Sequence, residues 1–293
     1  IPLLSSFACA IPGIMASRTI SDPRDRLTTI FVAPLMTCSA RLPVYALLIA
    51  AFIPAQTVWG FLNLQGLVLF GLYMAGIVSA LLVSFVLKFF HKDKSQHMLL
   101  MELPSYRFPD LKNVWIGLLD RGKIFLKRVG GIIFALSIVL WFLCTFPQPP
   151  EGATLPAIDY SLAGMLGHLM QPIFAPLGFN WQICIALIPA MAAREVVVAA
   201  LGTVYAMSAV DEDAMSEGLA ALISGGGDLG WSVATGLSLL VWFIYAPHCL
   251  ATLATVKRET GSWKTVSIMT VYLFGLAYFM SFLTYQIASY YLG

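Results

Sequence analysis

The sequence has 293 residues, of which 59% are hydrophobic and only 11% are charged, and its formal net charge is +2 at pH 7. Soluble domains carry about 25% charged residues, so a chain with a mean hydropathy of +0.83 cannot cover itself with a polar surface. The small net charge argues against nucleic acid as a partner, and the five cysteines form no CxxC zinc pattern and no tight secreted disulfide framework. Composition therefore predicts an all-α membrane protein, a polytopic helical bundle.

The first segment, residues 1–16, is shorter than a spanning helix and is interrupted. In "FACAIPGIMASRTISDPRDR", Pro12 and Gly13 follow Cys9, and five charges lie within the last nine residues. We expect the helix to break at Pro12 and Gly13 and to place Cys9 beside an internal path. The sequence begins without an initiator Met, signal peptide or basic leader, so we also expect it to be a fragment of a longer protein.

Apolar runs of the length that a spanning helix needs, about 20 residues, occur at 27–53, 61–90, 125–146, 181–207, 231–256 and 265–292. The connection 88–128 holds nine Lys or Arg against four Asp or Glu, and this positive bias predicts that it is cytoplasmic, together with the arginines at 18, 24 and 26. Within it, Glu102 and Pro104 belong to an extended piece. Residues 110–128 have the spacing of an amphipathic helix on the inner leaflet, or of a simple linker.

The second half does not fit simple crossings. If 125–146 leads out and 181–207 crosses back, the acidic loop 208–230 lies inside and "KRETGSWK", 257–264, lies outside, against the positive-inside tendency. The conflict disappears if 181–207 enters and returns, or if 161–178 adds a crossing. Pro189 in "IPAMAARE" favours the first solution, because irregular backbone at membrane depth is tolerated only where protein or a water-filled cavity covers it.

Two pairs of segments repeat. "IPGIMASRTI" at 11–20 resembles "IPAMAAREVV" at 188–197, and "APLMTC" at 33–38, with Pro34, is echoed by "APHC" at 246–249, with Pro247. Matching Gly or Pro interruptions in two halves point to the midplane site of a transporter. The sequence therefore predicts two pseudo-repeats with broken or re-entrant helices.

At these residues the chain resembles FeoB-type ferrous iron transporters. "CAIPGIMASRTI" and "RDRLTTIFVAPLMTCSARLPVYALLIAAFI" resemble the first Gate motif and the core segment after it. "MELPSYRFP" resembles the cytoplasmic connector, and "MAAREVVVAALGTVYA" and "APHCLATLATVKRET" resemble the second Gate region. The resemblance divides the chain into the C-terminal part of the first Gate region (1–45), core helices and connector (46–130), and the second Gate region with the terminal helices (131–293).

The resemblance implies Fe(II) uptake across a bacterial inner membrane by the permeation part of a GTPase-linked transporter. GTP and Mg would belong to an N-terminal domain. The sequence holds no GxxxxGK[ST] P-loop, so we expect neither enzyme activity nor a bound cofactor in this chain. The expected partners are Fe(II), the lipid bilayer, the GTPase domain, small accessory Feo proteins and, as an option, a second copy.

Fe(II) accepts thiolate, imidazole and carboxylate ligands. The family's proposed Gate cysteines correspond to Cys9 and Cys249, and Glu195 is an ionisable group at membrane depth, which marks a functional site by default. The alternatives stay open, because cysteines often only pack and Glu195 can lock a break by pairing with an arginine. Weaker ligand candidates are Cys38, His248 (inserted where the family often has cysteine directly after proline), Met15 and Met191.

Three other functions compete with iron transport. A nucleoside or organic-anion transporter with the same Gate-type repeats predicts polar and aromatic groups at the breaks rather than thiols. An intramembrane metalloprotease needs HExxH or an equivalent cluster, which the sequence lacks. A sensor with a membrane anchor leaves the broken helices unexplained.

Overall fold

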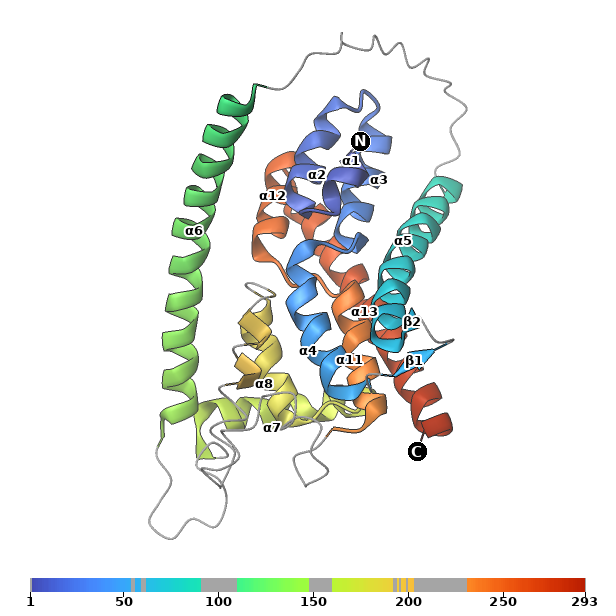
Figure 1. Ribbon diagram of the computed structural model, residues 1–293, viewed down its shortest axis with the longest axis vertical. Helices are drawn as coiled ribbons and strands as arrows, with labels where there is room; N and C mark the ends of the chain where they lie inside the picture. Colours follow the sequence, from blue (N-terminus) through green and yellow to red (C-terminus); the bar gives the residue numbers. More distant parts are fainter. Residues whose placement is uncertain are drawn as a thin grey trace.

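The computed structural model of the chain describes residues 2–53, 56–58, 62–90, 110–147, 160–191, 194, 196–198, 200–202 and 231–292. The described part is built from helices (Figure 1), apart from a short antiparallel pair, β1 (Thr57–Val58) with β2 (Leu62–Asn63). Three helical stretches among these residues are long and apolar enough to cross a membrane, namely Pro23–Phe52, Leu64–Phe89 and Trp263–Tyr291. The prediction of an all-α polytopic membrane protein is confirmed.

Three long helices stand upright in Figure 1: α5 (Leu64–Phe90), α6 (Leu111–Thr145) and α13 (Trp263–Leu292). Helix α13 packs along the second half of the chain, and its Tyr272 hydroxyl donates to the carbonyl of Phe31 at 2.6 Å in the first half. The two halves therefore share one buried core.

Helix α6 corrects one expectation. Residues 110–128 do not form a separate helix lying along the leaflet, because they continue without a break into the expected span 125–146. Asp110 caps the helix by accepting from the Lys112 amide at 3.1 Å, and the helix has 35 residues. At 1.5 Å per residue it is about 52 Å long, longer than the roughly 30 Å hydrocarbon core. No proline interrupts 111–145, so nothing local ends the helix at the membrane surface.

The remaining helices are short, and they fill the centre and the lower edge of the molecule in Figure 1. The first half contains α1 (Pro2–Ser6), α2 (Ala10–Ala16), η1 (Ser17–Thr19), α3 (Pro23–Val32), η2 (Ala33–Leu35), η3 (Ser39–Arg41) and α4 (Leu42–Phe52). The second half contains α7 (Leu162–Phe174), η5 (Ala175–Leu177), α8 (Trp181–Ala190), α11 (Val233–Tyr245) and α12 (Leu250–Thr260). The expected span 27–53 is thus interrupted at 36–38, and the expected span 231–256 at 246–249.

The break expected at Pro12 and Gly13 is misplaced. Both residues lie inside α2, and the chain leaves the helix at residues 7–9, before it. Proline is tolerated in the first turn, where its missing N–H has no helical partner anyway. Gly13 serves close packing instead, because a Cβ there would come within 1.9 Å of the Ser6 hydroxyl on α1.

The second half contains a sharply bent helix pair, with its corner at 178–180 rather than within the expected re-entrant segment 181–207, whose return lies partly outside the described residues. The stretch Leu162–Leu177 meets Trp181–Ala190 at an angle of 100°, with Gly178 at a positive φ of 77° in the corner. In Figure 1, α7 runs crosswise at the lower edge and α8 rises from it. Helix α8 ends at Ala190, one residue after Pro189, and residues 191 and 194 lie in turns.

This arrangement removes the conflict in the charge pattern. Glu259 accepts hydrogen bonds from both Arg18 and Arg26, so the basic segment 257–264 lies at the same end of the bundle as residues 18–26. Lys88 near the C-terminal end of α5 approaches Asp25 at 3.6 Å, so this end of α5 lies at the same end of the bundle. The positive residues therefore gather on one side, as the positive-inside tendency requires.

Candidate functional site

Three of the discontinuities carry a cysteine at the same structural position. Cys9 precedes α2 with φ −159° and ψ 138°, Cys38 precedes η3 with φ −100° and ψ 162°, and Cys249 precedes α12 with φ −163° and ψ 97°. All three backbones are extended, and each residue is the N-cap of the helix that follows. Each thiol thus lies where the chain changes from extended to helical geometry and leaves backbone groups outside the helical ladder.

Helices α2 and α12 lie side by side (Figure 1). Their C-terminal ends are tied together, because Arg18, two residues beyond α2, donates from Nε to a carboxylate oxygen of Glu259 at 2.8 Å. Arg26 donates to the same oxygen at 2.9 Å. Cys9 and Cys249 therefore lie at the same, opposite end of this helix pair.

The Glu259 carboxylate is well shielded, with a side chain only 2% exposed. Its hydrogen bond with Arg18, together with the charges of Arg18 and Arg26, lowers its pKa below the ordinary value. The same interaction raises the pKa of Arg18. This cluster ties the C-terminal ends of α2 and α12 together and joins the two halves of the chain.

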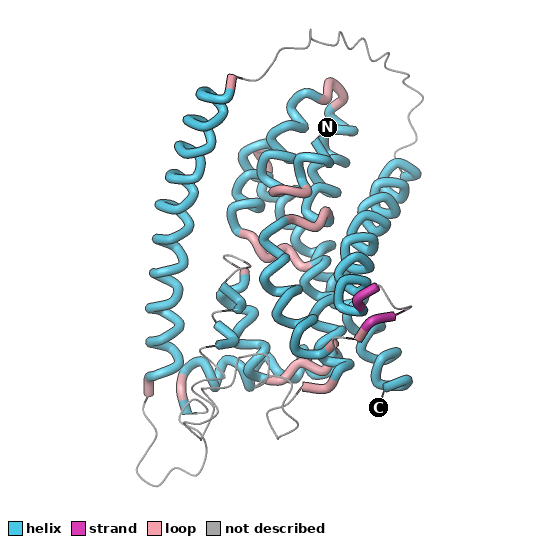
Figure 2. Tube along the Cα trace, viewed as in Figure 1, coloured by secondary structure: helices cyan, strands magenta, loops and turns pink. Residues whose placement is uncertain are grey.

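Two contacts bring the three cysteine-bearing breaks to one place. The Ser39 hydroxyl, next to Cys38, donates to the carbonyl of Ala8, next to Cys9, at 3.0 Å. Arg194 joins the other two breaks: its Nη1 lies 4.0 Å from the Cys38 sulfur, and its Nε donates to the carbonyl of His248 at 3.2 Å. Figure 2 shows loop segments at mid-height between the central helices, at the level where these breaks interrupt them. We call this region, defined by residues 7–9, 36–41, 194 and 246–249, the junction.

Two buried arginines lie at the junction, and sequence reasoning did not place them there. Arg41 is 1% exposed and donates to the carbonyl of Pro34 at 3.0 Å, while its Nε and Nη1 find no partner among the described residues. Arg194 is 7% exposed and also donates to the carbonyl of Ala246 at 3.1 Å. The signal was available, because a buried arginine within an apolar run must be matched by acceptors.

His248 is buried at the junction with 1% exposure. Its ring lies 5.0 Å from that of Phe243, and neither ring nitrogen has a hydrogen-bond partner within the described part of the chain. Its carbonyl, rather than its ring, is the group bound to Arg194. Buried polar atoms ordinarily have a hydrogen-bond partner. Within the described part of the chain, the two imidazole nitrogens of His248 are therefore polar atoms without such a partner, next to an aromatic ring.

The other candidate residues are spread over different settings. Cys9 is exposed, and Cys38 and Cys249 are partly buried. Met15 is 45% exposed on α2, and Met191 is partly buried in the turn after α8. Pro34 and Pro247 lie at the two Ala-Pro discontinuities. Glu195, Glu102 and Pro104 lie outside the described residues.

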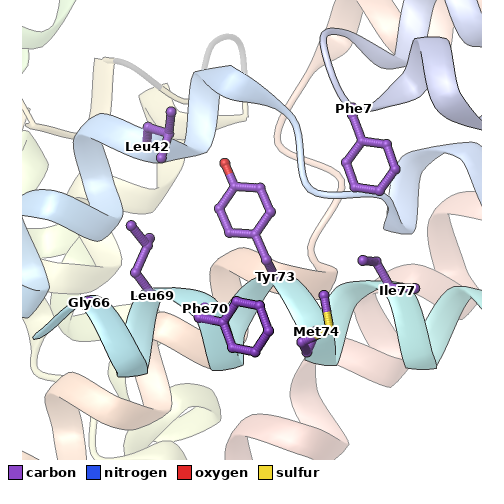
Figure 3. A pocket seen from close by; sticks show the side chains of 8 residues that line it. All are labelled: Phe7, Leu42, Gly66, Leu69, Phe70, Tyr73, Met74 and Ile77. Carbon is purple, nitrogen blue, oxygen red and sulfur yellow. The ribbon is translucent and has the colours of Figure 1, made fainter. Parts of the chain in front are cut away.

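An apolar groove opens beside the junction, on the surface of α5. It has a volume of about 530 Å³ and is lined by side chains from α5, by Leu42 and by Phe7. Figure 3 shows the Tyr73 ring rising from α5 between Leu42 and Phe7, with its hydroxyl away from the helix. Cys38 and Arg41 are within electrostatic range of Tyr73. No cysteine lines this groove, which has the character of a lipid-facing surface.

The described side chains do not form a compact metal cage. Nowhere in the described ranges do three or more His, Cys, Asp or Glu side chains gather as a metal site. The junction instead offers sulfur, backbone carbonyls and one imidazole from separate segments of the chain. Such a sparse set suits brief, successive contacts with an ion, because conduction requires binding weak enough to release it.

Comparison with known sequences gives two family matches. Residues 1–52 and 126–263 match the Gate family, described as nucleoside recognition. Residues 69–121 match the family described as ferrous iron transport protein B C terminus. The Gate match extends over more than half of the chain, so the assignment of the chain to this family does not depend on any one motif.

Several curated relatives align with nearly the whole chain. An Fe(2+) transporter FeoB of Leptospira interrogans serogroup Icterohaemorrhagiae serovar copenhageni is 40% identical over 98% of this chain and 42% of its own length. The FeoB of Staphylococcus aureus strain MSSA476 is 35% identical over 98% and 40%. A fusion of Fe(2+) transport protein A with FeoB from Porphyromonas gingivalis is 36% identical over 98% and 37%. The chain thus spans about two fifths of the length of these relatives, and no solved structure matches it.

Proposed function

The chain belongs to the Gate family, in the form found in FeoB-type ferrous iron transport proteins, and from this premise we propose that it forms the membrane pathway for Fe(II). The junction supports the proposal best, because three cysteine-capped discontinuities from both halves of the chain converge there. The names of the relatives, Fe(2+) transporter FeoB, supply the substrate. Fe(II) would pass inward through the junction across the inner membrane of a bacterium.

The chemistry of the junction suits a borderline divalent cation. An ion that sheds water needs replacement donors, and Cys38 and Cys249 offer sulfur beside the carbonyls of the Ala-Pro breaks. The positive end of a helix dipole favours negative charge, and the ligating form of cysteine is the thiolate. The helix starts at Cys9 and Cys249 therefore suit ligating sulfur. His248 adds a neutral nitrogen, and Glu195, if it reaches the junction, a carboxylate.

In this proposal each cysteine acts at a different stage. Cys9 is the exposed one, so it would receive or release the ion, whereas Cys38 and Cys249 would hold it at the buried centre beside Arg194. Met15 and Met191 serve packing or transient soft contacts. The Glu259 cluster would form the closed cytoplasmic end.

The remaining parts of the proposal concern the whole protein. Fe(II) is cargo, and we assign no resident cofactor and no chemical catalysis to this segment. GTP and Mg would act in a separate nucleotide-binding domain that regulates the pathway. The fusion of transport protein A with FeoB in one relative supports small accessory Feo proteins as partners. The nucleoside or organic-anion alternative gains no support, because the described breaks carry thiols.

The test is anaerobic uptake of radioactive iron by cells that express the full-length protein with single cysteine changes. Cys38→Ala and Cys249→Ala should reduce uptake at least tenfold, and Cys9→Ala should reduce it less. Cys144→Ala and Cys184→Ala are matched controls, since both thiols are buried in helices away from the breaks. Uptake that stays normal in the Cys38 and Cys249 variants would remove the ligand assignment. Nucleoside uptake without iron uptake would favour the alternative.

A further inference from the structure

The guanidinium of Arg194 has a different partner for each of its three nitrogens. Nε donates to the His248 carbonyl at 3.2 Å, Nη2 donates to the Ala246 carbonyl at 3.1 Å, and Nη1 lies 4.0 Å from the Cys38 sulfur. The side chain belongs to a residue that is only 7% exposed. One planar cation thus gathers two carbonyl oxygens from the second-half break and a sulfur from the first-half break.

These partners are of the kinds that a partly dehydrated divalent cation would use. Carbonyl oxygens replace a hydration shell in ion pathways, and sulfur selects metals such as Fe(II) over Mg or Ca. Arginine normally balances buried charge with a carboxylate, yet the contacts of Arg194 within the described ranges are carbonyls and a thiol. The guanidinium therefore occupies the position in which the two carbonyl oxygens and the sulfur would favour a cation.

We propose that Arg194 is a tethered cation that fills the ion position of the unloaded pathway, and that Fe(II) binds there only when this guanidinium withdraws. The inference rests on the proposed function and names the residue that controls access to the site. Two positive centres cannot share the same carbonyls, because like charges a few Å apart repel strongly in the protein interior. Occupancy by Arg194 and occupancy by the metal are mutually exclusive.

Arg41 explains why the exchange would be selective. It holds the Pro34 carbonyl in the first-half break at 3.0 Å, and electrostatic interaction couples it to Arg194. An incoming ion therefore has to displace the Arg194 guanidinium and also meets the charge of Arg41, and it must compensate for both with strong ligation. A monovalent cation gains little from sulfur, whereas Fe(II) gains sulfur and carbonyl ligation at once. The exchange thus favours a thiophilic divalent ion.

In this proposal the guanidinium withdraws by a change of rotamer. Arg194 lies in a turn beyond the C-terminal end of α8, so its backbone is not held within that helix. While the Arg194 guanidinium occupies the ion position, the protein cannot bind metal there, so only a fraction of the protein is competent to bind. The apparent metal affinity is lower by that fraction, and a change that removes the competitor restores it.

The experiment measures Co(II) binding to the full-length protein under anaerobic conditions, by the absorption of the cobalt–thiolate charge-transfer band, with Fe(II) as competitor. Arg194→Gln should bind Co(II) and Fe(II) at least tenfold more tightly than wild type. Arg194→Lys should bind about threefold more tightly, because a compact ammonium reaches fewer of the three partners. Arg258→Gln is the matched control, since it removes an exposed charge on α12 and should stay within twofold of wild type.

The outcomes separate this inference from the proposed function. Metal binding by wild type with equal or weaker binding by a folded Arg194→Gln protein overturns the tethered cation and leaves iron transport standing. Absence of metal binding in wild type and in every variant overturns both. If Arg194→Gln does not yield folded protein, the Arg194→Lys variant decides, and an affinity no tighter than that of wild type overturns the inference.

Discussion

The corner between η5 and α8 aims the re-entrant helix at the junction, and it depends on Gly178. This residue has a φ of 77°, and a Cβ on it would lie 2.1 Å from Cε2 of the Tyr285 ring on α13. Gly178→Ala therefore combines two costs. A left-handed conformation costs a residue with a Cβ about 1–2 kcal/mol, and forcing an extra methyl group against the ring costs about 1–3 kcal/mol. The expected loss of unfolding free energy is about 2–5 kcal/mol.

A second glycine separates these two contributions. Gly261, at the end of α12, has a φ of 67°, but a Cβ there would meet no atom within 4 Å. Gly261→Ala should therefore show only the backbone cost of about 1–2 kcal/mol. The assay is unfolding in mixed detergent micelles by titration with SDS, with helical circular dichroism as the signal. In a Tyr285→Ala background, Gly178→Ala should cost no more than Gly261→Ala. Equal losses for the two glycine variants in the wild-type background would refute the packing argument.

Two further changes test other contacts of the site. Glu259→Gln removes the charge that ties Arg18 to the second half, so thermal stability in detergent should fall at pH 7. Because hydrogen bonding to Arg18 lowers the pKa of Glu259 below its ordinary 4.5, wild-type stabilisation is complete above that value and is lost as the pH falls through the lower folded pKa. The Gln variant should lose less on acidification, and an identical acid profile would contradict this. Gly13→Ala should destabilise by about 1–3 kcal/mol through its clash with Ser6 on α1, whereas Gly71→Ala, which meets nothing within 4 Å, should not destabilise. A neutral Gly13→Ala protein would show that α1 and α2 do not pack as described.

The sequence was sufficient to predict the class of protein and the gathering of its basic segments at one end of the bundle. The lengths of apolar runs and the distribution of Lys and Arg are properties of whole segments. A prediction based on them therefore does not depend on the correct interpretation of any single residue. The charge pattern left two solutions, a return of 181–207 or an extra crossing at 161–178. The contact of Glu259 with Arg18 agrees with the requirement that both share, that 257–264 lies on the side of the arginines. These are averages over many residues, and tertiary packing does not change them.

The exact ends of the helices were harder to predict from the sequence. Pro12 and Gly13 indicated a break, yet proline at the third position of α2 is compatible with its first turn, and Gly13 is needed for contact with Ser6. A break at Pro34 was predicted within the apolar run 27–53, and the structure has the interruption just after it, at 36–38. A proline marks a constraint on the chain but does not say on which side of it the helix begins.

The junction itself depends on contacts between segments that are far apart in sequence. The repeat matched Cys38 with Cys249, but ligand assignment by family resemblance ranked Cys9 above Cys38. In the structure Cys38 is the thiol next to Arg194, 156 positions away. The sequence indicated that a buried arginine needs acceptors, but it could not say which ones, because the hydrogen-bond partners of Arg194 are backbone carbonyls, which have no signature in sequence.

The most direct test of the central claim, that sulfur from the junction binds the transported ion, is iron K-edge X-ray absorption of the full-length protein loaded anaerobically with one Fe(II). We expect sulfur scatterers in the first coordination shell of wild type and of Cys144→Ala, and their loss in the Cys38→Ala, Cys249→Ala double variant. A wild-type shell of oxygen and nitrogen alone, or a sulfur signal that survives in the double variant, would contradict the account.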